Sequence, residues 1–164
     1  MKYAVRDFRT SPLEAAVTLK LANAPDKVTV PAGGVKADAL FFLQAHAPRN
    51  TWKGKDGEEP PEMYVWDVVY EDGTTVPFPQ RYGVETAPWI TDAKPHGISR
   101  AALAWTVPAK EQGKSVQLFT VQWNNPNPDK KIKELVLRLG KHGDWFGWPV
   151  VLGVSAAQAK GESK

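Results

Sequence analysis

The chain has 164 residues, of which 42% are hydrophobic and 24% are charged, a size and composition that fit one globular domain with one sizeable core. Its net charge of +3 is small and its lysines and arginines are scattered, so nucleic-acid binding is not expected. The chain contains no cysteine, which excludes disulfides and thiolate sites, and no apolar run long enough for membrane insertion.

Alternation of apolar and polar side chains, the pattern of half-buried strands, recurs along the whole chain. In chain order it predicts strands over 16–21, 27–30, 37–47, 63–70, 75–78, 98–107, 115–123, 131–139 and 149–155. Asp72-Gly73 stands between two of these strands and predicts a tight hairpin, because glycine tolerates a positive φ. The segments 48–61, 80–97 and 124–129 are rich in polar residues, glycine or proline and are predicted to be loops or turns.

The segment 131–139 also fits helical spacing, but Leu135, Leu137 and Leu139 alternate with other residues directly before Gly140, which favours a strand. No helical pattern recurs between the strands, so a parallel α/β fold is disfavoured. We therefore expect an all-β, antiparallel two-sheet β-sandwich of the jelly-roll type. The domain is expected to span residues 1–156, with 157–164 as a flexible tail or linker.

Four segments carry a resemblance to a known group of modules: Lys36-Ala-Asp-Ala-Leu-Phe-Phe-Leu-Gln-Ala-His46, Tyr64-Val-Trp-Asp-Val-Val-Tyr-Glu-Asp-Gly73, Val76-Pro-Phe-Pro-Gln-Arg-Tyr-Gly83 and Gln122-Trp-Asn-Asn-Pro-Asn-Pro-Asp129. Together they resemble the β-sandwich accessory and carbohydrate-binding-like modules of bacterial glycoside hydrolases and related polysaccharide-degrading enzymes. The resemblance covers roughly residues 28–154. It implies a jelly-roll module with a sugar-binding or scaffolding role beside a catalytic domain. It also implies an extracellular or periplasmic location within a larger secreted protein, although no signal peptide is recognisable in this chain.

Seven tryptophans are the main functional signal, because an indole ring matches the C–H face of a sugar in shape and in charge distribution. Three of them lie on predicted strand faces and are expected to pack in the core: Trp66, Trp105 and Trp123. The other four lie in loops and are candidate sugar contacts: Trp52, Trp89, Trp145 and Trp148. The alternative for these four is that they cap the open end of the sandwich.

The long loop after the strand at 75–78 contains Arg81, Tyr82 and Glu85, with Trp89 close behind. A guanidinium, a carboxylate and two aromatic rings in one loop predict a ligand-binding cluster, since long loops often carry function. The alternative is an ion pair between Arg81 and Glu85 that holds the loop together. Asn124, in the rigid Asn-Pro turn, is a further candidate for contact with sugar hydroxyls.

A metal site is not expected, because His46, His96 and His142 show no ligand spacing among them. The nearest acidic group, Asp56 with Glu58 and Glu59, is interpreted as a solvated loop rather than a calcium site.

Glycosidases need two carboxylates facing each other, and the candidate pairs are Asp67 with Glu71 and Glu85 with Asp92. Neither a Gly-x-Ser-x-Gly motif nor a phosphate-binding loop occurs in the chain. Catalysis is therefore not expected, and no cofactor is predicted.

The sequence thus predicts a non-catalytic carbohydrate-binding module that targets or supports a polysaccharide-degrading enzyme. Its expected partners are a polysaccharide or oligosaccharide and a neighbouring catalytic domain. One alternative is a structural β-sandwich module that packs against a neighbouring domain without binding sugar, which predicts an exposed apolar patch on one sheet. The other alternative is a small glycoside hydrolase or lyase.

Overall fold

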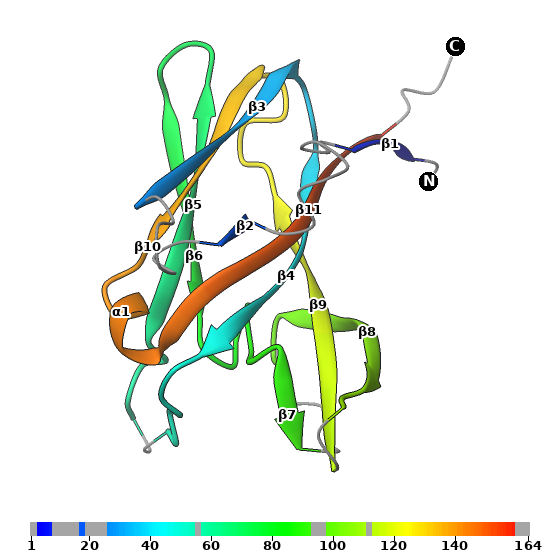
Figure 1. Ribbon diagram of the computed structural model, residues 1–164. Coiled ribbons are helices and arrows are strands. Elements are labelled where there is room, and N and C mark those ends of the chain that lie inside the picture. Colours follow the sequence, from blue (N-terminus) through cyan, green and yellow to red (C-terminus); the bar gives the residue numbers. More distant parts are fainter. Residues whose placement is uncertain are drawn as a thin grey trace.

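A computed structural model describes residues 3–7, 17–18, 26–54, 57–92, 98–110 and 113–159, and it confirms the all-β prediction (Figure 1). Two antiparallel sheets pack face to face. Sheet A contains β1 (Tyr3–Asp7), β2 (Val17–Thr18), β4 (Ala39–Pro48), β7 (Ile90–Asp92), β8 (Ala101–Pro108), β9 (Lys114–Asn124) and β11 (Gly147–Ala159). Sheet B contains β3 (Lys27–Val35), β5 (Glu62–Tyr70), β6 (Thr75–Arg81) and β10 (Ile132–Leu139). One short helix, α1 (Gly143–Phe146), precedes β11.

The strand order is that of a jelly roll. When β2, β7 and β8 are set aside, sheet A reads β1-β11-β4-β9 and sheet B reads β3-β10-β5-β6. Numbered along the chain, these eight strands give the orders 1-8-3-6 and 2-7-4-5, in which successive strands repeatedly cross between the sheets. The predicted jelly-roll type is therefore confirmed, and so is the strand assignment of 131–139 as β10.

Aromatic side chains from both sheets fill the core. The ring of Phe42 lies 5.1 Å from that of Trp66 and 5.7 Å from that of Phe78, and Phe78 lies 6.3 Å from Trp123. Trp66 and Trp123 are buried, as predicted for strand-face tryptophans. The corresponding prediction for Trp105 is wrong, because this side chain is 48% exposed.

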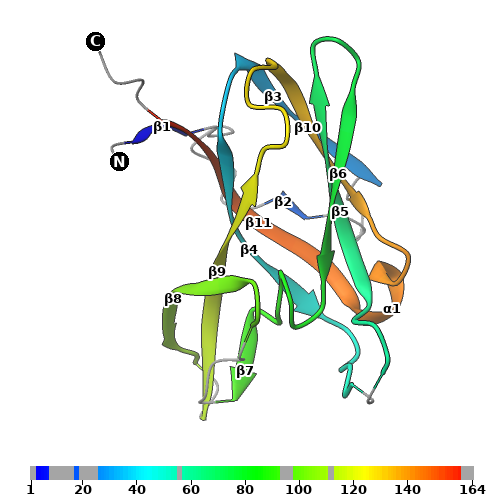
Figure 2. The same cartoon turned by 180° about the vertical axis from the view of Figure 1, so that it is seen from behind.

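The exposure of Trp105 follows from where its strand lies. The first half of β9, residues 114–118, extends past the edge of sheet B together with β7 and β8 (Figure 2). We call this group of strands the flange. Sheet B does not cover the flange, so the alternating pattern of β8 has no second layer to pack against, and residues 102–106 are all exposed.

The hairpin between β5 and β6 forms at Asp72-Gly73 as predicted. The N–H of Tyr70 donates to the Thr74 carbonyl over 2.9 Å, and Gly73 takes a φ of 85°. The Asp72 carboxylate accepts the Thr74 N–H at 2.9 Å, which closes the turn from its own side chain.

The structure departs from the sequence-based elements in several places. β1 was not predicted, β3 continues past the predicted strand 27–30 to Val35, and β6 continues past 75–78 to Arg81. Residues 90–92 of the predicted loop 80–97 form β7, and α1 was not predicted. β11 continues to Ala159, with Ala157 buried and paired to Ala39, so the predicted domain boundary after 156 falls inside a strand. Of the predicted strand 16–21, only 17–18 lie among the described residues, and 160–164 lie outside them.

Candidate functional site

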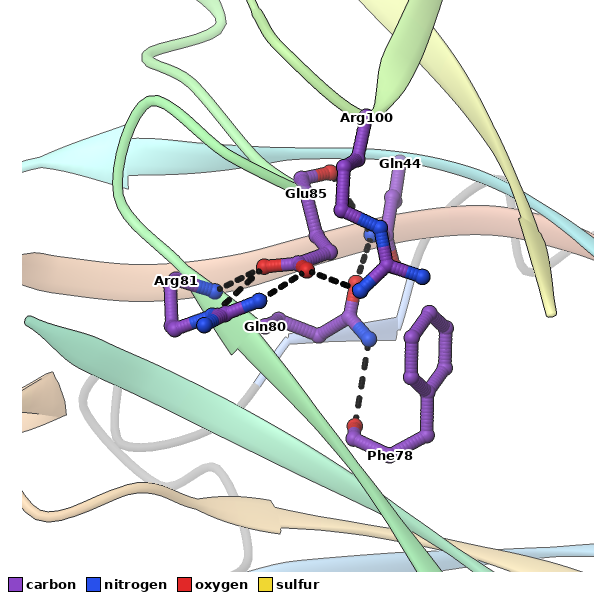
Figure 3. A network of polar contacts seen from close by, with 6 residues as sticks. All are labelled: Gln44, Phe78, Gln80, Arg81, Glu85 and Arg100. Atoms are coloured by element: carbon purple, nitrogen blue, oxygen red, sulfur yellow. Dashed lines mark hydrogen bonds and ion pairs between the residues drawn. The ribbon is translucent and has the colours of Figure 1, made fainter. Parts of the chain in front are cut away.

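The Arg81–Glu85 cluster is closed by its own contacts (Figure 3). The Glu85 carboxylate, which is completely buried, accepts the Arg81 main-chain N–H at 3.0 Å. It also accepts two bonds from the Arg81 guanidinium, at 3.1 and 2.7 Å, and one from Arg100 at 3.2 Å. The bonds to Glu85 raise the pKa of Arg81 above its usual value, so the guanidinium stays charged. These contacts agree with the alternative interpretation of the sequence, in which an ion pair between Arg81 and Glu85 holds the loop together.

Gln44, on the central strand β4, connects this cluster to the core. Its side-chain N–H₂ donates to the Gln80 side-chain oxygen and, at 3.3 Å, to the main-chain carbonyl of Glu85. Its own oxygen accepts the indole N–H of Trp66 at 3.4 Å. A glutamine inside so apolar a strand is unusual in the sequence, and the structure explains it as the centre of a buried network that joins both sheets.

A second set of buried polar contacts fixes the residues that follow. The Tyr64 hydroxyl donates to Thr86 Oγ1 at 3.0 Å, and His46 Nδ1 lies 3.3 Å from the same oxygen. Burial raises the pKa of Tyr64 well above its usual value, so the hydroxyl keeps its proton. Residues 83–88, which we call the plug, therefore fill one end of the sandwich, with residues 85–88 buried.

Tyr82 and Trp52, two of the predicted ligand contacts, pack beneath the surface at the same end. Tyr82 is 5% exposed, and its ring meets those of Trp52 and Phe146 edge-on, each at 6.1 Å between centroids. Burial raises the pKa of Tyr82, and a hydrogen bond to the Trp52 backbone partly offsets this. Trp52 is half-buried, and its indole N–H is buried without a partner among the described residues.

Helix α1 is held at the end of the sandwich by residues that follow β4. The Arg49 guanidinium donates to the Asp144 carbonyl at 2.6 Å, and the Asn50 side chain donates to the Trp145 carbonyl at 2.5 Å. Gly147 then starts β11 with a φ of 144°, and a Cβ there would lie 2.1 Å from the carbonyl oxygen of Ala47. Only glycine allows this approach. The Trp145 side chain, two residues earlier, is 65% exposed.

Three of the four predicted loop tryptophans gather around the last residues of β4. Trp148 pairs with Ala47 on one side of this strand, and on its other side the N–H of Trp89 donates to the His46 carbonyl at 2.9 Å. The backbones of Trp89 and Trp148 are thus two strand spacings, about 10 Å, apart. Trp89 is 42% exposed, Trp148 is half-buried, and Trp145 lies three residues before Trp148. We call Trp89, Trp145 and Trp148 the indole end.

Asn124 does not belong to this end. It pairs with Ala39, the first residue of β4, whereas Gly147 pairs with Pro48, the last, so the two positions are about 30 Å apart. The exposed Asn124 side chain accepts a bond from Gln122 at 2.6 Å. The buried amide of the turn is its neighbour Asn125, which donates to the Ala37 carbonyl at 2.8 Å.

A shallow groove of about 470 Å³ lies on the outer face of sheet B at the same end as α1. Val65, Pro77 and Pro79 contribute apolar surface to it, and Glu62 and Lys141 contribute charge. Glu62 pairs in register with Arg81, which places the groove beside the plug.

Three of the four candidate catalytic carboxylates, Asp67, Glu71 and Glu85, are held in ion pairs, and the fourth, Asp92, lies exposed on β7. Asp67 accepts bonds of 2.6 and 3.2 Å from Arg138 across sheet B, and Glu71 lies 3.9 Å from Lys131. Within the described part of the chain, no group of three His, Asp or Glu side chains is arranged to hold a metal ion. No helix among those residues is long and apolar enough to cross a membrane.

Comparisons of the chain with protein-family models, with curated proteins and with solved structures found no significant match.

Proposed function

We propose that this domain is a non-catalytic carbohydrate-binding module that takes a polysaccharide or oligosaccharide at the indole end. The observation that carries the proposal is the gathering of three accessible tryptophans around the end of one strand, β4. Scattered surface tryptophans would need no explanation, but three at one end of a sheet offer stacking surfaces for more than one sugar ring.

Polar groups suited to sugar hydroxyls lie beside these indoles. Arg49 is exposed and uses a guanidinium N–H to hold the Asp144 carbonyl, which leaves further donors on the same planar group. Asn50 is fixed against the main-chain carbonyl of Trp145, so an amide stands beside the backbone that carries the exposed indole. Such a combination of flat apolar surface with a few oriented polar groups is typical of a sugar site.

In this proposal the plug and the two residues before it hold the site in place. Tyr82 and Glu85 are buried, and Arg81 is engaged with Glu85, so these three residues position the loop that ends in Trp89. Trp52 packs on Tyr82 and follows Arg49 and Asn50, the residues that hold α1. The proposal therefore assigns direct sugar contact to Trp89, Trp145 and Trp148, and a positioning role to the other four.

A non-catalytic role is supported by the state of the carboxylates. Glu85 is sealed by two arginines, and Asp67 is held by Arg138 on the outer face of sheet B. A hydrolase of this kind needs two carboxyl groups that face one substrate. The proposed role is to bring a polysaccharide-degrading enzyme, in a secreted protein, to its substrate.

The test is affinity electrophoresis of the domain in gels that contain plant, algal or host polysaccharides, together with a glycan array. We expect retardation by at least one polysaccharide, and a roughly tenfold loss of affinity in Trp145→Ala and in Trp89→Ala. Trp105→Ala is the matched control, because it removes an indole of similar exposure from the flange and should bind normally. Silence across all glycans, or equal losses in all three variants, would rule the proposal out.

The second candidate is a structural module that packs against a neighbouring domain and binds no sugar. Two observations favour it: the Arg81–Glu85 loop is a plug rather than a cleft, and Leu103 and Trp105 are exposed on the flange. This candidate predicts that the double variant Trp52→Ala/Trp89→Ala keeps every interaction of the wild-type domain. The same electrophoresis separates the two candidates, because only the first loses a measurable affinity.

A further inference from the structure

Strand β8 forms an open edge of sheet A. Within the described part of the chain it pairs with β9 alone, along Ala101–Pro108, so the polar groups of its other edge face away from the sheet. Because β8 belongs to the flange, sheet B leaves most of it uncovered, and only Ala101 at its start packs against the core (Figure 2). An edge of this kind is a template for a further strand.

The side chains of β8 are unusual for an edge that stays in water. None of the residues from Ala101 to Pro108 is charged. Leu103 is 41% exposed and Trp105 is 48% exposed, and the residues around them are exposed as well. Edge strands that remain unpaired commonly carry lysine or proline in their interior, and β8 has proline only as its last residue.

The two edge strands of sheet B carry residues that hinder pairing with a further strand. β6 carries Pro77 and Pro79, which have no N–H to offer to an incoming strand. β3, the opposite edge, begins with Lys27 and contains Pro31. The contrast sets β8 apart as an edge that is left available for pairing.

We propose that β8 pairs antiparallel with β8 of a second copy of this chain, so that sheet A continues across a two-fold axis. An identical strand is favoured as the occupant because β8 is uncharged, and two copies therefore meet without like charges opposite each other. The charge that precedes the strand, Arg100, is paired with the buried carboxylate of Glu85 at 3.2 Å. Apolar side chains of both copies are removed from water in the same contact.

The dimer is a weak one. A register shift between Leu103 and Trp105 marks a bulge, which divides the edge into two short stretches. A contact made by so short a strand lies at the small end of the range for specific interfaces, where association is transient. Two domains joined in this way carry two indole ends, but pairing through β8 does not depend on the proposed sugar site.

The test is sedimentation of the whole domain, without sugar, from low micromolar concentration upward. We expect the mean mass to rise from that of a monomer toward that of a dimer. Ala104→Lys, at an exposed position of β8, should weaken the dimer roughly tenfold, because each copy then brings a positive charge into the contact. Thr75→Lys places the same side chain on the edge strand β6 and should dimerise as the wild type does.

Hydrogen exchange locates the contact. On raising the concentration, main-chain amides of β8 should exchange more slowly, while those of β6 keep their rate. A chain that stays monomeric at every concentration, or an Ala104→Lys dimer as tight as that of Thr75→Lys, would overturn the proposal and leave a neighbouring domain as the occupant of β8. If Ala104→Lys does not fold, Ala102→Lys takes its place, since that side chain is also exposed.

Discussion

The side-chain amide of Gln44, on β4 of sheet A, donates to that of Gln80, on β6 of sheet B, and so joins the two sheets through the interior. Both residues are completely buried, and each makes a further bond to a main-chain carbonyl: Gln44 to Glu85 and Gln80 to Phe78. Because buried amides stabilise only when they are paired, this contact ties the position of the plug to the packing of the core.

Gln44→Leu should destabilise the domain by about 3 kcal/mol, because it leaves the Gln80 oxygen and the Trp66 indole N–H without their partner. Gln80→Leu should cost less than this, and the double variant should cost less than the sum of the two single variants. Urea unfolding of the four proteins gives the coupling. Strictly additive losses would show that the two amides do not act as a pair.

Removal of the Glu85 carboxylate should loosen the plug. We expect Glu85→Ala to lower the free energy of unfolding by about 2–3 kcal/mol, because bonds from two arginines are lost. Glu71→Ala, which removes a half-exposed carboxylate 3.9 Å from Lys131, is the control and should unfold as the wild type does. An unchanged urea midpoint for Glu85→Ala would contradict the structural role of the ion pair.

Acid should weaken the β5–β6 hairpin at Asp72. The bond from Lys130, followed by that from the Thr74 N–H, holds the pKa of this carboxyl down at about 2. Since the folded-state pKa lies below that of the unfolded chain, the stabilisation is present above about pH 4 and is lost as the pH falls toward 2. NMR titration of the Asp72 carboxyl measures this pKa directly. Asp72→Asn should remove the corresponding part of the acid dependence of unfolding.

The two strand tryptophans Trp66 and Trp105 should respond in opposite ways to truncation. Trp66 is 1% exposed and packs on Phe42, so Trp66→Ala should cost about 3–5 kcal/mol. Trp105 is 48% exposed on the flange, so Trp105→Ala should cost less than about 1 kcal/mol in the monomer. Thermal unfolding at low concentration measures both values. Similar costs for the two variants would place Trp105 in a core after all.

Two glycines of β11 offer a matched test of the turn that presents Trp145. Gly147→Ala should destabilise the domain by at least about 2 kcal/mol. Gly147 has a φ of 144°, and a Cβ added there would lie 2.1 Å from the carbonyl oxygen of Ala47. Gly153→Ala should be tolerated, since nothing lies within 4 Å of the Cβ that it adds. Circular dichroism and thermal unfolding distinguish the two. Equal stability of both variants would mean that the α1–β11 junction is not constrained.

Most strands were predictable because alternation is a local property. Tyr64, Trp66, Val68 and Tyr70 recur at every second position, and the sheet places all four in the core. The same rule was misleading for Trp105, since alternation indicates a strand and does not say whether another sheet covers it. Coverage depends on the length of β9 relative to sheet B, which no local pattern contains.

The candidate site was predictable in composition and only partly in geometry. Trp89 and Trp148 come to lie on the two sides of β4 through long-range pairing that sequence spacing does not reveal, and Trp145 follows from its place just before Trp148. Asn124 was grouped with them on its chemistry, yet it stands at the opposite end of β4. The role of Gln44 had one visible signal, a polar side chain in the otherwise apolar run of β4.

The pairing of β1 with β11 sets how the domain responds to a pulling force. Tyr3 lies opposite Ala159, so the two strands meet at their outer ends, close to the ends of the chain (Figure 1). Tension applied between these two residues breaks the hydrogen bonds between β1 and β11 one after another from that end, instead of loading all of them at once. A tether attached at this corner would also leave α1, at the far end, facing outward.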